Sequence, residues 1–181
     1  MTKTLSLLRH AKSGWDDPVA RDFDRPLNDR GETAAKLIGT WLKSANTAFD
    51  HVIASPAVRV IETLDHISIG YGERISPVWE RKIYLASSAT LMDILREAND
   101  EHDHILMVGH NPGMEDLVLD LVPDTSSDAL REAVYEKYPT ASYAQISLNI
   151  ESWSDIARGG GKLDIFKRPR DLDPKLGPEE Y

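Results

Sequence analysis

Leu5-Ser6-Leu7-Leu8-Arg9-His10 is the stretch that decides the fold of this chain. A short apolar run bounded by polar residues is typical of a buried strand. Strands buried on both faces belong to parallel α/β sheets, in which ligands bind outside the carboxyl ends of the strands. Arg9 and His10 come directly after the apolar run, so we expect both side chains at the edge of the sheet where such a fold places its chemistry.

The composition limits the class of protein. The chain has 181 residues, 41% of them hydrophobic, which is enough for one domain with a sizeable core. A net charge of -9 excludes nucleic acid as the main partner, because phosphate backbones require a basic face. Cysteine is absent, which excludes disulfides and thiolate metal sites. No apolar run has the length of a secretory signal or a membrane span, so we expect a cytoplasmic protein without a membrane partner.

Apolar periodicity predicts an alternation of strands and helices along the rest of the chain. After a long polar loop, predicted helices follow the caps Asn28 or Asp29, Ser55, Ser88 and Asn111, and predicted strands cover 51–54, 75–79, 105–108, 146–150 and 163–165. Residues 124–139 are predicted to form a loop with one short helix. The charged, proline-rich tail over 169–181 is expected on the surface.

Three of the predicted strands end in groups suited to an anion. These groups are Arg9-His10, Ser55 to Arg59, and Gly109-His110, and they converge if the strands are parallel neighbours. The helix that opens at Pro56 would add unpaired backbone N–H groups and the positive end of its dipole. The guanidinium groups of Arg9 and Arg59 match phosphate oxygens in a bidentate manner.

His10 is the candidate nucleophile of this cluster. Neighbouring cations disfavour the protonated imidazole, which keeps the ring neutral near pH 7. If one ring nitrogen bonds a backbone carbonyl, the other is free to attack. His110 could donate a hydrogen bond to the charge that develops during transfer. Because phosphoryl transfer needs little beyond positioning and charge stabilisation, the cluster indicates that chemistry.

Arg9-His10-Ala11, Ser55 to Arg59 and Gly109 to Pro112 resemble the motifs of the histidine phosphatase superfamily, whose hallmark triplet is Arg-His-Gly. Arg25 to Gly31 and Tyr84 to Ser87 resemble its SixA-type phosphohistidine phosphatase branch. The resemblance implies a phosphoglycerate mutase-like fold: an α/β three-layer sandwich with a mostly parallel central sheet flanked by helices, as a single domain over 1–181. Ala11 replaces the hallmark glycine, and we expect a slightly altered backbone path there without loss of function.

The same resemblance assigns roles to site residues. It implies that His10 is the phosphorylated nucleophile and that Arg9, Arg59 and His110 form the phosphate pocket. It also implies that Arg25 reaches the phosphate from the loop, and we place Ser13 with it among the phosphate-binding or substrate-binding candidates. No metal or cofactor is implied.

The general acid stays open at this stage. Glu80 to Tyr84 resembles the segment where mutase-like relatives carry their proton donor, so Glu80 is one candidate; Asp16 and Asp17, on the loop beside the nucleophile, are the others. Water is the remaining alternative. We therefore predict a cofactor-independent phosphatase that acts on a phosphorylated protein such as a phosphohistidine protein or on a similar small substrate. The sequence leaves its oligomeric state open and favours a monomer. A small-metabolite phosphomonoesterase and a non-catalytic phosphate-binding module are the alternatives.

Overall fold

A six-stranded sheet forms the centre of the computed structural model, which describes residues 2–16, 18, 21–125 and 128–178. The strand order is β3-β2-β4-β1-β5-β6. The first four of these strands are mutually parallel, whereas β5 and β6 join them in antiparallel pairs. The strands are β1 (Lys3–Arg9), β2 (His51–Ala54), β3 (Val78–Trp79), β4 (His104–Gly109), β5 (Tyr143–Leu148) and β6 (Gly161–Lys167).

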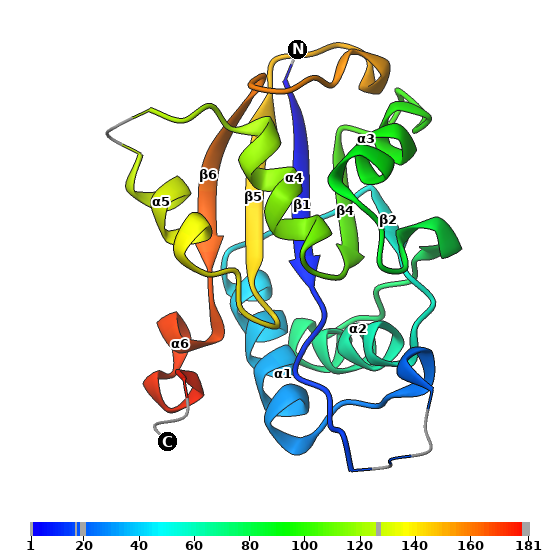
Figure 1. Ribbon diagram of the computed structural model, residues 1–181, viewed down its shortest axis with the longest axis vertical. Helices are drawn as coiled ribbons and strands as arrows, with labels where there is room; N and C mark the ends of the chain where they lie inside the picture. The colour runs from blue at the N-terminus through cyan, green and yellow to red at the C-terminus, as the bar shows by residue number, and fades with distance from the viewer. Residues whose placement is uncertain (1, 17, 19–20, 126–127, 179–181) are drawn as a thin grey trace.

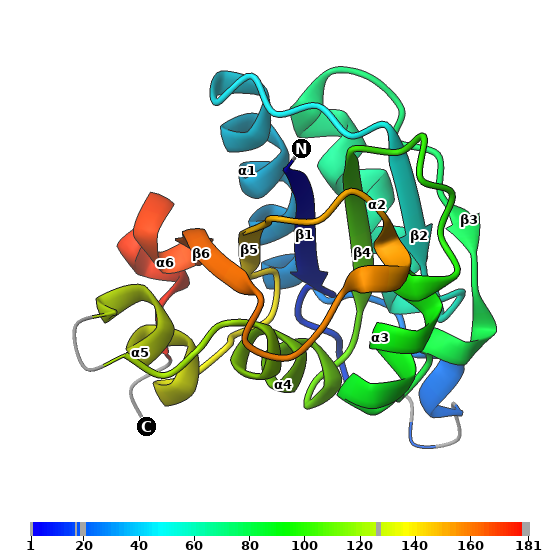
Figure 2. The ribbon, with the colours of Figure 1, turned by 90° about the horizontal axis from the view of Figure 1, so that it is seen from above.

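Helices cover both faces of this sheet and complete three layers. The two longest helices, α1 (Asp29–Ser44) and α2 (Val58–Tyr71), lie on one face, as Figures 1 and 2 show. The opposite face is covered by α3 (Ser88–Arg96), α4 (Gly113–Leu121) and α5 (Ala129–Glu136). The short helices are α6 (Pro169–Leu172) and the 3-10 turns η1 (Asp22–Asp24), η2 (Arg81–Ile83), η3 (Trp153–Asp155) and η4 (Pro174–Leu176). The predicted α/β sandwich with a mostly parallel sheet is confirmed.

Strand β1 is buried on both faces, as its sequence predicts. Leu5 and Leu7 belong to the core between the sheet and α3 and α4, and Leu8 belongs to the core under α1 and α2. The one polar residue in the run, Ser6, is fully buried, and its hydroxyl bonds the Tyr143 hydroxyl at 2.6 Å and His104 Nε2 at 2.7 Å. Its hydrogen-bonding capacity is therefore satisfied inside the core.

Two glycines allow α1 and α2 to pack closely. A Cβ at Gly39 would lie 2.1 Å from the backbone oxygen of Ile67, and one at Gly70 would lie 2.0 Å from that of Lys36. Only a residue without a Cβ fits at such distances. These contacts bring the last turns of α2 close to the middle of α1.

Several predicted boundaries were wrong, each for a local reason. Helix α2 begins at Val58, so Ser55 is not its N-cap. Ser87 caps α3 by accepting from the Thr90 N–H, whereas Ser88 Oγ donates to Asp120. Helix α4 begins at Gly113, although Asn111 Oδ1 accepts from the Glu115 N–H. Strand β3 is limited to Val78–Trp79, because Pro77 has no N–H to pair with a neighbouring strand.

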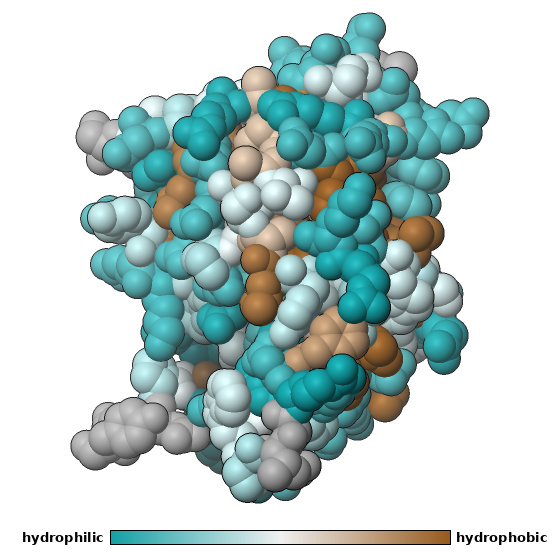
Figure 3. All heavy atoms as spheres, turned by 45° about the vertical axis from the view of Figure 1, so that its right-hand side comes forward, coloured by the Kyte–Doolittle hydropathy of each residue, from teal (hydrophilic) through white to brown (hydrophobic). Residues whose placement is uncertain are grey.

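The tail beyond β6 packs against the rest of the fold. Pro169 is buried, and Leu172 and Leu176 contact the core under α1 and α2. The Arg30 guanidinium, at the start of α1, donates to the Gly177 carbonyl. Within the described residues, no helix combines the length and apolar character that a membrane crossing needs. The face turned forward in Figure 3 is mostly hydrophilic, with hydrophobic side chains in separate patches.

Candidate active site

The carboxyl ends of three parallel strands meet at one edge of the sheet. Arg9 at the end of β1 is in register with Gly109 at the end of β4, and Ala54 at the end of β2 is in register with Val108. The His10 N–H donates to the Gly109 carbonyl at 3.0 Å. The structure therefore brings together the three chain segments that the sequence singles out.

His10 and His110 face each other at this edge, with ring centroids 5.3 Å apart. His10 Nδ1 lies 2.7 Å from the backbone oxygen of Ala11. Because a carbonyl oxygen can only accept, Nδ1 carries the proton and Nε2 keeps its lone pair. Burial is the main cause that lowers the pKa of His10 to about 3; the hydrogen bond to Ala11 opposes this shift, and the neighbouring His110, Arg59 and Arg9 add to it. The imidazole is therefore neutral near pH 7, with one nitrogen able to act as a nucleophile.

His110 is held by a serine. Its Nε2 lies 2.8 Å from Ser55 Oγ, and this hydroxyl also accepts from the Ala57 N–H at 3.3 Å. Burial is the main cause that lowers the pKa of His110 to about 3, followed by the charge of Arg59. Its Nδ1 is buried without a hydrogen-bond partner among the described residues. Ser55 thus orients His110 instead of capping α2.

Two arginines complete the cluster. Arg59 is 2% exposed, and the Nη1 atom of Arg9 donates to the Tyr138 carbonyl at 2.8 Å. Burial lowers the pKa of Arg9 from its ordinary value, although a guanidinium still remains charged. The Nε atoms of both arginines are buried, and within the described part of the chain neither has an acceptor. Buried N–H groups without acceptors are uncommon, and an anion in this cluster would provide oxygens for them.

Asp22 is a member of the site that the sequence analysis missed. Its carboxylate accepts from Arg59 Nη2 at 3.0 Å, from Arg25 Nε at 3.0 Å and from the Tyr84 hydroxyl. Partial burial raises the pKa of Asp22, but the hydrogen bonds from Tyr84, Arg25 and Arg59 outweigh it and lower the pKa to about 2. Asp22 is thus an anion that holds the donors of two arginines. Nothing in the sequence distinguishes it from the other carboxylates of the same loop.

Tyr84 was missed as a site residue as well. Its ring and that of His110 are nearly perpendicular, with centroids 5.3 Å apart, and the Arg59 guanidinium lies 5.8 Å from the Tyr84 ring centre. A signal was present here, because Tyr84 belongs to one of the segments that carry the family resemblance.

Arg25 and Ser13 lie side by side on the loop between β1 and α1. Arg25 Nη1 donates to Ser13 Oγ, and the guanidinium lies 3.6 Å from the centre of the Trp15 ring. The loop is closed by a bridge between Ser13 and Leu27. Arg25 is 8% exposed and shares Asp22 with Arg59, so it belongs to the same cluster.

Among the described residues, the acid candidates Glu80 and Asp16 are not part of this cluster of contacts. Glu80 follows β3, and its carboxylate accepts from the Lys82 N–H at 3.0 Å, which caps its own turn. Asp16 is exposed, and its carboxylate lies near Gly14. Asp17 lies outside the described residues. Among those described, no group of three or more histidine and carboxylate side chains could hold a metal ion.

The fold and this cluster define the class of protein. Residues 5–82 match the model of the histidine phosphatase superfamily, branch 1. An uncharacterised protein of Mycobacterium tuberculosis is 34% identical over 90% of this chain and 100% of its own length. The chain belongs to the histidine phosphatase superfamily.

Two further relatives place it in the SixA-type branch. The phosphohistidine phosphatase SixA of Escherichia coli is 25% identical over 65% of this chain and 73% of its own length. A structure from Nakamurella multipartitia that carries the SixA name is 27% identical, with a TM-score of 0.80, covering 93% of this chain and 97% of that one. The fold and family that the resemblance implies are therefore confirmed.

Proposed function

We propose that this protein is a cofactor-independent phosphatase that takes the phosphoryl group of a phosphohistidine protein, or of a similar phosphoramidate, onto Nε2 of His10 and passes it to water. The observation that carries the proposal is the hydrogen bond from His10 Nδ1 to the Ala11 carbonyl. This bond fixes the tautomer in which Nε2 has a free lone pair. The low pKa of His10 keeps that lone pair available near neutral pH.

The first step exchanges one P–N bond for another. Nε2 of His10 attacks phosphorus, the bond between phosphorus and the substrate nitrogen breaks, and the departing imidazole takes a proton. Arg9 and Arg59 neutralise the phosphoryl oxygens, with their Nε–H groups available for this purpose. The Ser55 hydroxyl donates a hydrogen bond to Nε2 of His110, so the proton of this imidazole is on Nδ1 and can be donated in a hydrogen bond to the transferring group.

The second step releases the product. Water attacks the phosphorus of phospho-His10, the P–Nε2 bond breaks, and orthophosphate leaves while the proton of water passes to solvent. His10 regains its neutral form. The same arginines stabilise both transition states, because the charge on the three equatorial oxygens is similar in each.

The position of Glu80 supports a phosphoramidate as substrate. An alkyl phosphate leaves as a strongly basic alkoxide and needs a placed proton donor, whereas an imidazole is a far weaker base that solvent can protonate. The cluster offers several N–H donors to a phosphoryl group, but the carboxylate of Glu80 is used to cap its own turn. This asymmetry favours cleavage of a P–N bond over cleavage of an alkyl ester.

Isotopic labelling tests the proposal. The protein is exposed to a ³²P-phosphohistidine peptide, quenched in alkali and analysed for acid-labile label. We expect label and turnover in the wild type and in His66→Ala, whose histidine lies on α2 outside the cluster, and neither in His10→Ala. Turnover in His10→Ala would exclude the mechanism. Faster hydrolysis of alkyl monoesters than of phosphohistidine in the wild type would instead support a metabolite phosphomonoesterase.

A further inference from the structure

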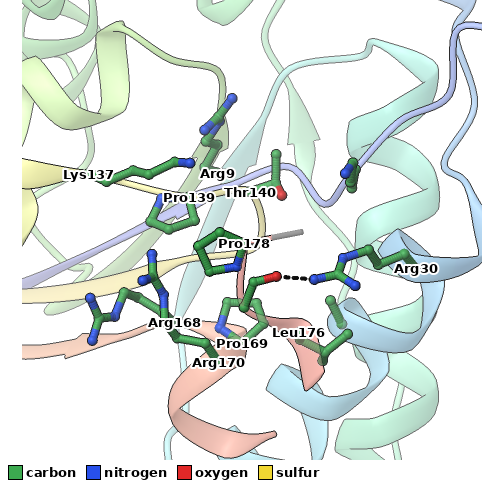
Figure 4. Close-up of a pocket in the computed structure, with 13 residues that line it drawn as sticks. Arg9, Arg30, Lys137, Pro139, Thr140, Arg168, Pro169, Arg170, Leu176 and Pro178 are labelled. Carbon is green, nitrogen blue, oxygen red and sulfur yellow. Dashed lines mark hydrogen bonds between the residues drawn. The ribbon is translucent and has the colours of Figure 1, made fainter. Parts of the chain in front are cut away.

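A basic groove lies beside the candidate active site. It is a cavity of about 330 Å³ between the start of α1, the loop before β5 and the tail that contains α6 and η4. Figure 4 shows that its cations come from opposite sides of the opening. They are Arg9, Lys12, Arg30, Lys137, Arg168 and Arg170.

The charge of this groove is opposite to that of the protein. The chain carries a net charge of -9, yet no Asp or Glu is among the described residues that line the groove. Arg9, Arg30 and Arg168 already have partners in the protein: Arg168 pairs with Asp171 at 2.9 Å, Arg30 donates to the Gly177 carbonyl, and Arg9 donates to the Tyr138 carbonyl at 2.8 Å. Lys137 and Arg170 have no carboxylate partner within the described part of the chain. Like charges gathered in this way repel one another, and an anionic ligand would relieve that repulsion.

Apolar side chains alternate with the cations on the walls. Pro139, Pro169 and Leu176 line the groove, and Figure 4 shows Pro139 and Pro178 between Lys137 and Arg30. A site for a small polyanion would surround it with converging donors. Here the cations are spread around apolar walls, which suits a chain that carries both carboxylates and apolar side chains.

Arg9 connects the groove with the candidate active site. It lines the groove, and it is the neighbour in sequence of His10. The residues next to Lys137 reinforce the connection, since the Tyr138 carbonyl accepts from Arg9 and the Ala141 N–H donates to the backbone oxygens of Arg9 and His10. A polypeptide whose phosphorylated side chain enters the pocket at His10 would therefore place neighbouring residues in the groove.

We infer that the basic groove binds an acidic segment of the phosphorylated protein, with its carboxylates on the cations and its apolar side chains on the proline walls. This inference rests on the proposed function and adds the substrate class: phosphoproteins with acidic residues near the phosphorylated histidine. Such contacts act on KM, because they are made equally in the ground state and the transition state.

Direct binding tests the groove independently of catalysis. The probe is a fluorescein-labelled peptide in which Glu alternates with Leu, and its counterpart has Gln in place of Glu; anisotropy is measured at low salt. We expect the Glu peptide to bind the wild type about tenfold more tightly than the Gln peptide, and the double variant Lys137→Ala/Arg170→Ala to lose this preference. The matched control, Lys43→Ala/Lys162→Ala, removes two exposed lysines that do not line the groove. This variant should keep the preference for the Glu peptide.

The sequence continues beyond Pro178 with two carboxylates, Glu179 and Glu180, so the same titration is made on a chain ending at Pro178. Tighter binding of the Glu peptide to this shorter chain would support the groove as a site for acidic polypeptide. Equal binding of the Glu and Gln peptides to both chains would overturn the inference. Binding of inorganic polyphosphate to the protein without any binding of the Glu peptide would also overturn it, in favour of a small polyanion.

Turnover then separates this inference from the proposed function. Phosphohistidine is placed in both peptides, and kcat/KM is measured for each. We expect the Glu peptide to be preferred through a lower KM in the wild type and in the control variant, and not in Lys137→Ala/Arg170→Ala. Equal turnover of both peptides by the wild type would contradict the inference about the groove and would leave the proposed function supported. Binding of the Glu peptide without turnover of either phosphopeptide would contradict the proposed function and would leave the inference about the groove supported.

Discussion

Arg59 and Asp22 are joined by two hydrogen bonds across 37 residues of sequence: Nη1 donates to the Asp22 backbone oxygen at 2.6 Å, and Nη2 donates to its carboxylate at 3.0 Å. The backbone bond ties the loop before α1 to the start of α2. The carboxylate bond gives Arg59 an anion of the protein's own. Since Arg25 also pairs with Asp22, this one carboxylate competes for donors that a phosphoryl group would use.

Removing the charge of Asp22 tests that competition. In Asp22→Asn the arginines lose a competing anion, so we expect orthophosphate to inhibit the enzyme at about fivefold lower concentration. The measurement is the inhibition constant of orthophosphate. Asp24→Asn is the matched control, because Asp24 lies on the same turn and pairs with Arg21 instead. Weaker inhibition in Asp22→Asn would show that the carboxylate positions the arginines for phosphate.

Turnover should depend on the planar guanidinium of Arg59 and not only on its positive charge. Arg59→Lys keeps one positive charge but loses the bidentate geometry, and we expect kcat/KM to fall about 10²-fold or more. Arg74→Lys, at an exposed arginine outside the cluster, provides the comparison. Unchanged turnover in Arg59→Lys would place this residue outside the phosphate pocket.

Glu80 allows the two substrate classes to be compared within one variant. If Glu80 serves as a proton donor despite its place outside the cluster, Glu80→Gln should slow hydrolysis of an alkyl monoester much more than that of phosphohistidine, because only the alkoxide needs a donor. The measurement is kcat/KM for both substrates in the wild type and the variant. Equal losses on both would indicate a general or structural role for Glu80. No loss on either would return the acid role to Asp16, Asp17 or water.

Burial of His10 and His110 makes the stability of the fold depend on pH. Both pKa values are about 3 in the folded protein, below the ordinary value of 6.5, so the unfolded chain binds more protons in that interval. Their contribution is complete above pH 6.5 and is lost as the pH falls toward 3. Each histidine should lower the free energy of unfolding by about 2 kcal/mol between pH 6.5 and pH 5.

Urea titrations of the wild type and His110→Gln over this range measure the slope. The variant removes one of the two buried imidazoles, so its free energy of unfolding should fall less steeply with decreasing pH. Parallel curves for the two proteins would show that His110 does not titrate in this way.

The sequence determined the fold class and the centre of the site. Leu5 to Leu8 predicts a strand buried on both faces, and the three strand ends predict a convergence of Arg9, His10, Arg59 and His110, because parallel strands place their carboxyl ends at one edge. Such patterns can be recognised in the sequence because the side-chain periodicity of a strand or a helix involves only residues that are close together in the chain.

Only the tertiary structure decided which groups hold that centre in place. Ser55 has the sequence position of a helix cap, but the packing of β4 against β2 places His110 within reach of its hydroxyl. Asp22 is one carboxylate among several on an aperiodic loop, and its role depends on where the loop crosses α2. The basic groove joins residues from both ends of the chain. Contacts between segments far apart in sequence depend on how the layers pack, and no local pattern encodes that packing.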